Sequence, residues 1–197
     1  VEKGVMIWSD EIYEHLIYGN AKHQTVASFS SEHQAHTIIT HGLAKAWSMT
    51  GWRLGFIAAP EPIAKRINAI QSHSTSNPTS FAQKGGVEAL RGSQHHLKEW
   101  LPEFDRRRTY AYERLTAMPG VTCVKAQGAF YLFPNISGTG MQSTEFCDQL
   151  LERSQVAAVP GIAFGSDDYI RISYATSMAN IQKGMDRMDA FVRSLHS

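Results

Sequence analysis

Short, continuous runs of apolar residues alternate with stretches of helical periodicity in the first half of the chain. Three such runs predict strands over Val5–Trp8, Thr37–Thr40 and Arg53–Ala59. Because their apolar residues are consecutive rather than alternating, these runs are typical of strands covered on both faces, as in a parallel α/β sheet. Apolar residues at helical spacing predict helices over 62–70 and 80–90.

The pattern changes after a long, charged stretch at Leu97–Met118, which predicts a helix that ends at a Pro-Gly turn. Shorter elements follow. The predicted strands and helices of this second half cover 121–124, 129–133, 144–153, 170–174 and 180–195. We therefore expect an α/β fold with two domains, residues 1–101 and 102–197, divided inside the long helix near Pro102.

Composition narrows the class of protein. Hydrophobic residues make up 43% of the chain and charged residues 19%, so it can build an ordinary globular core. The net charge of +1 gives no electrostatic case for nucleic acid or an anionic membrane, and no apolar run reaches membrane length. The basic run Arg106–Arg108 lies among acids of the long helix, so we expect it on a solvated helix face.

Cysteine and histidine positions favour an intracellular protein without a metal site. Cys123 and Cys147 fit neither a metal spacing nor a disulfide framework, which favours a reducing compartment and a cytoplasmic location. No acid or cysteine completes a ligand set at metal spacing with the histidines, which are His33, His36 and His41. The chain starts at Val1 and leads into no signal-peptide core, so we expect a fragment.

Three short segments carry candidate chemistry. Lys45 lies among small and apolar residues, where a lysine tends to lose its proton and become a nucleophile toward aldehydes. Asp10 follows a predicted strand, where α/β sheets place their ligands, although an aspartate there can also cap a helix. Arg171 is flanked by apolar residues on a predicted strand and needs an anion, either a ligand or the nearby Asp167 or Asp168.

These segments resemble a known family. His41–Gly55, Ser9–His15 and the stretch 159–175 are similar to the motifs of class I aminotransferases of the aspartate aminotransferase type. The resemblance runs along the whole chain and corresponds to the C-terminal half of that family. It implies the fold of the type I pyridoxal-phosphate (PLP) enzymes, with residues 1–101 as the later part of the large PLP-binding domain and 102–197 as the small C-terminal domain.

The resemblance assigns a role to each candidate residue. Lys45 would form the imine with PLP and then move a proton as general base and acid. Asp10 would pair with the pyridine nitrogen, and Tyr13 would donate to the phenolic oxygen. Arg53 would bind the cofactor phosphate through its planar fork, or else form a structural salt bridge. Arg171 would bind the α-carboxylate of the substrate.

The implied activity moves an amino group between an amino acid and a 2-oxo acid, with aspartate and 2-oxoglutarate as the leading pair. The family's enzymes act as homodimers, so we expect a homodimer for the full-length protein. Two other hypotheses stay open. One is an aromatic or prephenate-type aminotransferase, or a PLP lyase, on the same fold. The other is a non-catalytic truncated fragment, because the glycine-rich phosphate loop and the cofactor-stacking aromatic of the family are not visible in this chain.

Overall fold

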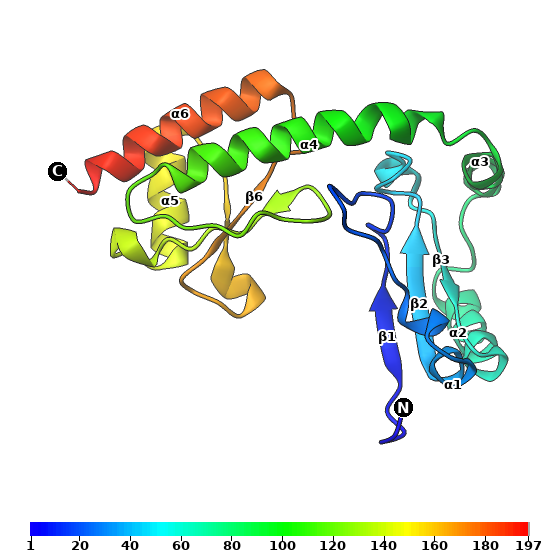
Figure 1. Cartoon of the computed structure of the whole chain (residues 1–197). Helices are drawn as coiled ribbons and strands as arrows, with labels where there is room; N and C mark the ends of the chain where they lie inside the picture. Colours follow the sequence, from blue (N-terminus) through cyan, green and yellow to red (C-terminus); the bar gives the residue numbers. More distant parts are fainter. Residues whose placement is uncertain (197) are drawn as a thin grey trace. The chain divides into compact units, whose positions relative to one another are not determined.

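The computed structural model describes residues 1–196, and the chain divides into two compact units (Figure 1). The first unit is Val1–Lys98 and the second begins at Glu99. Each unit contains its own small sheet and its own helices, which confirms the expected α/β class. The helix α4 (His95–Thr116) contains the division, and the expected domain boundary at residues 101 and 102 lies within the same helix.

The first unit is built on a three-stranded sheet. Its strands, in spatial order, are β1 (Ile7–Asp10), β2 (Thr37–Gly42) and β3 (Gly55–Ala58). β1 and β2 are parallel as expected, but β2 and β3 are antiparallel, so the sheet is mixed. The reason is the short connection, 43–54, which contains turns and the 3-10 helix η2 (Thr50–Trp52) rather than a crossover helix. A chain that returns without a crossover helix pairs antiparallel.

Short helices complete the first unit. In chain order they are η1 (Val26–Ser28), α1 (Ser31–Ala35), α2 (Glu61–Ser74) and α3 (Ser80–Arg91). α2 and α3 confirm the two predicted helices. Two glycines inside α3 allow it to approach the residues before β3 closely. A Cβ atom would lie 2.6 Å from the ring of Trp52 at Gly85 and 2.5 Å from the side chain of Leu54 at Gly86.

The sheet of the first unit exposes much of its apolar surface. Every residue of β3 is exposed, and Trp8 of β1 is 77% exposed. The expectation that these strands are covered on both faces is therefore wrong for the structure formed by residues 1–196. The consecutive apolar residues of the strands are present, but no described element packs over all of them.

The second unit has an antiparallel sheet and a closed core. The sheet order is β4 (Tyr131–Leu132), β6 (Ile170–Ser173) and β5 (Val159–Pro160). The other elements are η3 (Ser137–Thr139), α5 (Ser143–Ser154), η4 (Gly161–Phe164) and α6 (Met178–Ser194). α5 packs on α6, where the rings of Phe146 and Phe191 lie 5.2 Å apart, centroid to centroid, in an edge-to-face contact. α5, α6 and β6 confirm predicted elements.

One predicted strand of the second unit is wrong. Of residues 121–124, only Thr122 pairs with another strand-like residue, through an isolated bridge to Asn135. Val124 is 86% exposed. β-branched residues favour a strand, but a strand needs a neighbour along its length. β4 pairs with β6 and not with residues 121–124, so this segment has no neighbouring strand along its length.

The basic run of α4 is only partly solvated. Arg106 and Arg107 pair with Glu103, and their hydrogen bonds lower the pKa of that carboxyl to about 2. Arg108 is only 7% exposed, which corrects its predicted place on a solvated face. Its guanidinium donates to Asp105 and to the carbonyl of Ala126, and these acceptors allow the charge to be buried. Within residues 1–196, no helix is both long and apolar enough to cross a membrane.

Candidate functional site

The carboxyl ends of β1 and β2 lie side by side in the first unit. Asp10, the last residue of β1, is paired with Thr40 of β2. The backbone N–H of Glu11 donates to the carbonyl of Thr40 at 2.9 Å, which continues the pairing by one residue. The Asp10 carboxylate is exposed and accepts from the backbone N–H of Ile12 at 3.2 Å. Asp10 thus both shapes the turn after β1 and presents a negative charge at the strand end.

Lys45 lies in the connection between β2 and β3 and is half-buried. Its Nζ lies over the ring of Tyr13, 5.6 Å from the centroid. The connection is held by its own backbone. The Ser48 N–H donates to the Lys45 carbonyl at 3.2 Å, and the Thr50 hydroxyl donates to the Ala44 carbonyl at 2.9 Å. The structure therefore brings together two of the predicted site residues, Lys45 of this connection and Tyr13 of the turn after β1.

Arg53 ends η2 in a left-handed backbone conformation, with φ of 54°. One terminal nitrogen donates to the Thr50 carbonyl at 2.9 Å. Arg53 makes no ion pair with any acid that the structure describes, so the alternative salt bridge is not formed there. It lines a pocket of about 670 Å³. The other residues of that lining, none of them acidic, are Gly51, Trp52, Gln71, Thr75, Asn77, Pro78, Thr79 and Phe81.

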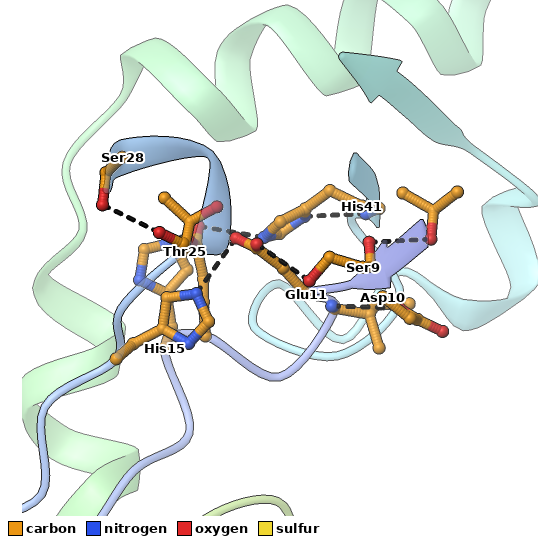
Figure 2. Close-up of polar contacts among 12 residues, drawn as sticks. Ser9, Asp10, Glu11, His15, Thr25, Ser28 and His41 are labelled. Atoms are coloured by element: carbon orange, nitrogen blue, oxygen red, sulfur yellow. Dashed lines mark hydrogen bonds and ion pairs between the residues drawn. The ribbon is translucent and has the colours of Figure 1, made fainter. Parts of the chain in front are cut away.

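A buried acid lies next to Asp10 (Figure 2). Glu11 is only 5% exposed, and its two carboxylate oxygens lie 3.0 Å from His23 Nε2 and 3.1 Å from the Ser9 hydroxyl, which donates to it. Burial acts to raise the pKa of Glu11, but hydrogen bonds from neighbouring side chains, including His23 and Ser9, outweigh it and lower the pKa. Glu11 therefore stays ionised and ties the turn after β1 to the loop that contains His23.

A second acid connects the segment of Tyr13 to the end of β2. Glu14 Oε1 lies 2.9 Å from His41 Nε2 and 3.1 Å from His15 Nε2. His41 is buried and stacks on Phe56 of β3, with 5.2 Å between ring centroids. The N–H of Gly42 donates to His41 Nδ1 at 2.7 Å. Nδ1 is thus an acceptor, and Nε2 faces Glu14 without a hydrogen bond between them.

No motif in the sequence marks the contacts of these two acids. No spacing in the sequence connects Glu11 to His23 or Glu14 to His41, since each pair meets only through the fold of the turns and strands between its members. The ligand atoms of Glu11, Glu14 and His23 lie within 4.8 Å of one another, the one such group among residues 1–196. Because these groups already pair with neighbours, their arrangement is explained without a metal. The absence of a metal site stays a prediction.

Arg171 lies on β6 in the second unit. Its guanidinium carbon lies 4.5 Å from the ring centroids of both Tyr131 and Phe164. Its Nε is buried without a hydrogen-bond partner, and Arg171 pairs with no acid among the described residues. Asp167 instead accepts from the N–H and hydroxyl of Ser143. The alternative of an internal ion pair is therefore not formed, and the arginine retains capacity for an anion.

The residues of the first unit fit a cofactor that has an aldehyde, a ring nitrogen, a phenolic oxygen and a phosphate. Lys45 provides an amine, Tyr13 a phenol beside it, and Asp10 a carboxylate at the strand end. Arg53 lines a pocket without acids, where a phosphate meets no like charge. These donors match the needs of PLP, and they lie within one compact unit.

Comparison with known proteins identifies the family. The family described as "Aminotransferase class I and II" matches residues 1–188. The aspartate aminotransferase of Geobacillus stearothermophilus is 45% identical over 97% of this chain and 50% of its own length. The probable aspartate/prephenate aminotransferase of Aquifex aeolicus is 44% identical over 95% of this chain and 49% of its own.

Solved structures agree. The chain superposes on an aromatic aminotransferase from Pyrococcus horikoshii with a TM-score of 0.94 and 40% identity, over 98% of this chain and 53% of the other. The chain thus spans about half the length of the curated relatives it matches. The matching family, the sequence identity and the shared fold point to one conclusion: this chain belongs to the class I and II aminotransferases.

Proposed function

We propose that this chain provides the lysine-bearing half of a PLP-dependent aminotransferase that uses aspartate and 2-oxoglutarate. The observation that supports this most strongly is the position of Lys45. Its Nζ lies 5.6 Å from the centroid of the Tyr13 ring, on a loop beside the strand that ends at Asp10. This is the combination of amine, phenol and carboxylate that PLP chemistry requires.

Each residue of the first unit has a role in the proposal. Lys45 Nζ holds the cofactor covalently and later moves a proton at the substrate α-carbon. Asp10 keeps a proton on the pyridine nitrogen, and the Tyr13 hydroxyl donates to the phenolic oxygen. When bound, PLP supplies the electron sink for the bond that breaks at the α-carbon. Arg53 binds the phosphate through two parallel hydrogen bonds.

Arg171 of the second unit binds the α-carboxylate of amino and oxo acids. Its lack of an acidic partner among the described residues supports this role. The two units would be the later part of a large PLP-binding domain and a small C-terminal domain. We further propose a cytoplasmic homodimer, as the family resemblance implies.

Aspartate is preferred as donor because the relatives in Geobacillus stearothermophilus and Bacillus subtilis have the name aspartate aminotransferase, at 45% and 43% identity. A second candidate is an aromatic or prephenate-type aminotransferase. The names of the relatives in Thermococcus litoralis and Aquifex aeolicus, at 40% and 44% identity, support it. The side chain that distinguishes these donors is not assigned in this chain.

The test is an amino-transfer assay on the chain loaded with PLP. Aspartate and phenylalanine serve as alternative donors to 2-oxoglutarate, and glutamate formation is measured. We expect glutamate with aspartate, none in Lys45→Ala, and an unchanged rate in Lys65→Ala, a matched change at an exposed lysine (76% side-chain exposure). Faster transfer from phenylalanine favours the second candidate.

A non-catalytic fragment predicts a different result. In that case glutamate does not form with any donor, although the chain is folded. Turnover that persists in Lys45→Ala would contradict the proposed role of the lysine under either candidate activity.

A further inference from the structure

Two aromatic rings enclose Arg171. The strand order β4-β6-β5 places Arg171 on the central strand. Tyr131 belongs to β4, on one side of that strand, and Phe164 ends η4, directly after β5 on the other side. The guanidinium carbon lies 4.5 Å from each ring centroid. The rings therefore approach the guanidinium from opposite neighbours of β6, and its carbon lies over each ring at cation–π distance.

The nitrogens of Arg171 differ in their surroundings. Nε is buried, has no hydrogen-bond partner and is covered by protein. The two terminal nitrogens form no hydrogen bond or ion pair with any described residue, and neither of them is a buried unpaired atom. The terminal edge of the guanidinium is thus accessible, while its carbon lies over the two rings. That edge presents two parallel N–H groups in one plane.

We propose that Tyr131 and Phe164 are specificity-determining residues that select a planar carboxylate over a tetrahedral anion at Arg171. The inference rests on the proposed carboxylate-binding role of Arg171 and deepens it. Both oxygens of a carboxylate can lie in the plane of the guanidinium and accept from the two terminal nitrogens. A sulfonate or phosphate has further oxygens above and below that plane. Those oxygens meet the ring faces, which are electron-rich and repel an anion.

The experiment compares two anions of equal charge and different shape, acetate and methanesulfonate. The observable is the NMR signal of the Arg171 side-chain Nε–H, assigned by its loss in Arg171→Lys. The two rings shield this group, so we expect its signal to be shifted upfield from those of exposed arginines. We expect acetate to perturb it at a concentration at least fivefold lower than methanesulfonate.

The variants Phe164→Leu and Tyr131→Leu test the rings themselves. Phe164 is 47% exposed, so its replacement leaves the core intact. The variant Phe164→Leu therefore tests the proposal even if Tyr131→Leu does not fold. We expect that in Phe164→Leu acetate and methanesulfonate perturb the signal at nearly equal concentrations, so that the ratio of the two concentrations is close to one. The matched control is Ile162→Ala, on the same short helix and 57% exposed, which keeps the preference.

Three results would overturn the proposal. They are equal responses to both anions in the unsubstituted chain, an unchanged preference in Phe164→Leu, and no saturable response to acetate. A merely structural role for the rings would change the stability of the fold without changing the ratio of the two affinities. Labelling of Lys45 by PLP reports on the first unit, so it can fail while the anion preference of Arg171 persists, and the two failures are distinguishable.

Discussion

The two units of this chain bury their apolar residues to very different extents. In the second unit, Phe146, Leu150 and Met188 are fully buried between two helices and an antiparallel sheet. In the first unit, the whole of β3 is exposed, and Trp8 and Phe56 show 77% and 43% of their surface. The second unit has a closed core of its own, whereas the first has a sheet with uncovered apolar faces.

This difference shows which interactions hold the candidate functional residues of each unit in place. Around Lys45 in the first unit, Leu43, Ala46 and Met49 are buried, and the turn after β1 also holds a buried charge, Glu11, which pairs with His23. Arg171 is held by packing, between two rings on a sheet with a buried core. Changes of the core should therefore affect the second unit most, and changes of buried charge should affect the first.

The largest effect is expected for Phe146→Ala. This side chain is fully buried and contacts the ring of Phe191, so its removal leaves a cavity that lowers the free energy of unfolding by about 3–5 kcal/mol. Urea unfolding followed by circular dichroism measures it. The matched control in the first unit is Phe81→Ala, at a ring that is 68% exposed, where we expect a loss below about 1 kcal/mol. Equal losses at the two positions would remove the contrast between the units.

A smaller effect is expected for Glu11→Gln. The change removes a buried charge–histidine contact and lowers the free energy of unfolding by about 1–3 kcal/mol at neutral pH. Because the pKa of Glu11 is lowered in the folded chain, its stabilising contribution is present above the unfolded pKa, near 4.5, and is lost as the pH falls through the folded pKa. Unfolding measured from pH 7 to pH 3 should show the two proteins converge. A gap that is independent of pH would contradict the ionised state of Glu11.

An exposed apolar residue of the first sheet should matter little for stability. Trp8→Ala is expected to change the free energy of unfolding by no more than about 1 kcal/mol, since the ring is mostly exposed and makes one hydrogen bond, to Thr40. It should lower the fluorescence of a hydrophobic dye bound to the chain, because it removes apolar surface. Unchanged dye binding would show that the dye reports another surface.

The last prediction concerns the reactivity of a thiol and not the stability of the fold. Burial and the nearby Asp148 raise the pKa of the Cys147 thiol to about 11, so roughly one thiol in a thousand is ionised at pH 8. Cys147 should resist iodoacetamide in the folded chain and react after urea is added, while the less buried Cys123 reacts first. Mass spectrometry of the labelled peptides measures the order. Early labelling of Cys147 would indicate that the second unit opens readily.

The sequence predicts much of the fold because its apolar patterns are local. Helices α2, α3, α5 and α6 follow from residues three and four apart, and their bounds differ from prediction by a few residues. The antiparallel pairing of β3 and the absence of a strand at 121–124 depend on which strands meet, which no local pattern records.

The candidate site shows the same division. Lys45, Asp10 and Arg171 stand in recognisable segments, so the sequence alone identifies them as candidates. The buried state of Glu11, the contact between Glu14 and His41, and the two rings around Arg171 arise only when separate strands come together. Sequence reasoning finds the residues that bear chemistry, and it misses the neighbours that hold them in place.

The most direct test of the central claim is a PLP titration of the chain followed by borohydride reduction and peptide mass mapping. We expect a saturable pyridoxyl label on Lys45, no corresponding label in Lys45→Ala, and an unchanged label in Lys65→Ala. Labelling scattered over exposed lysines, or none at all, would contradict the claim that Lys45 is the cofactor-binding lysine.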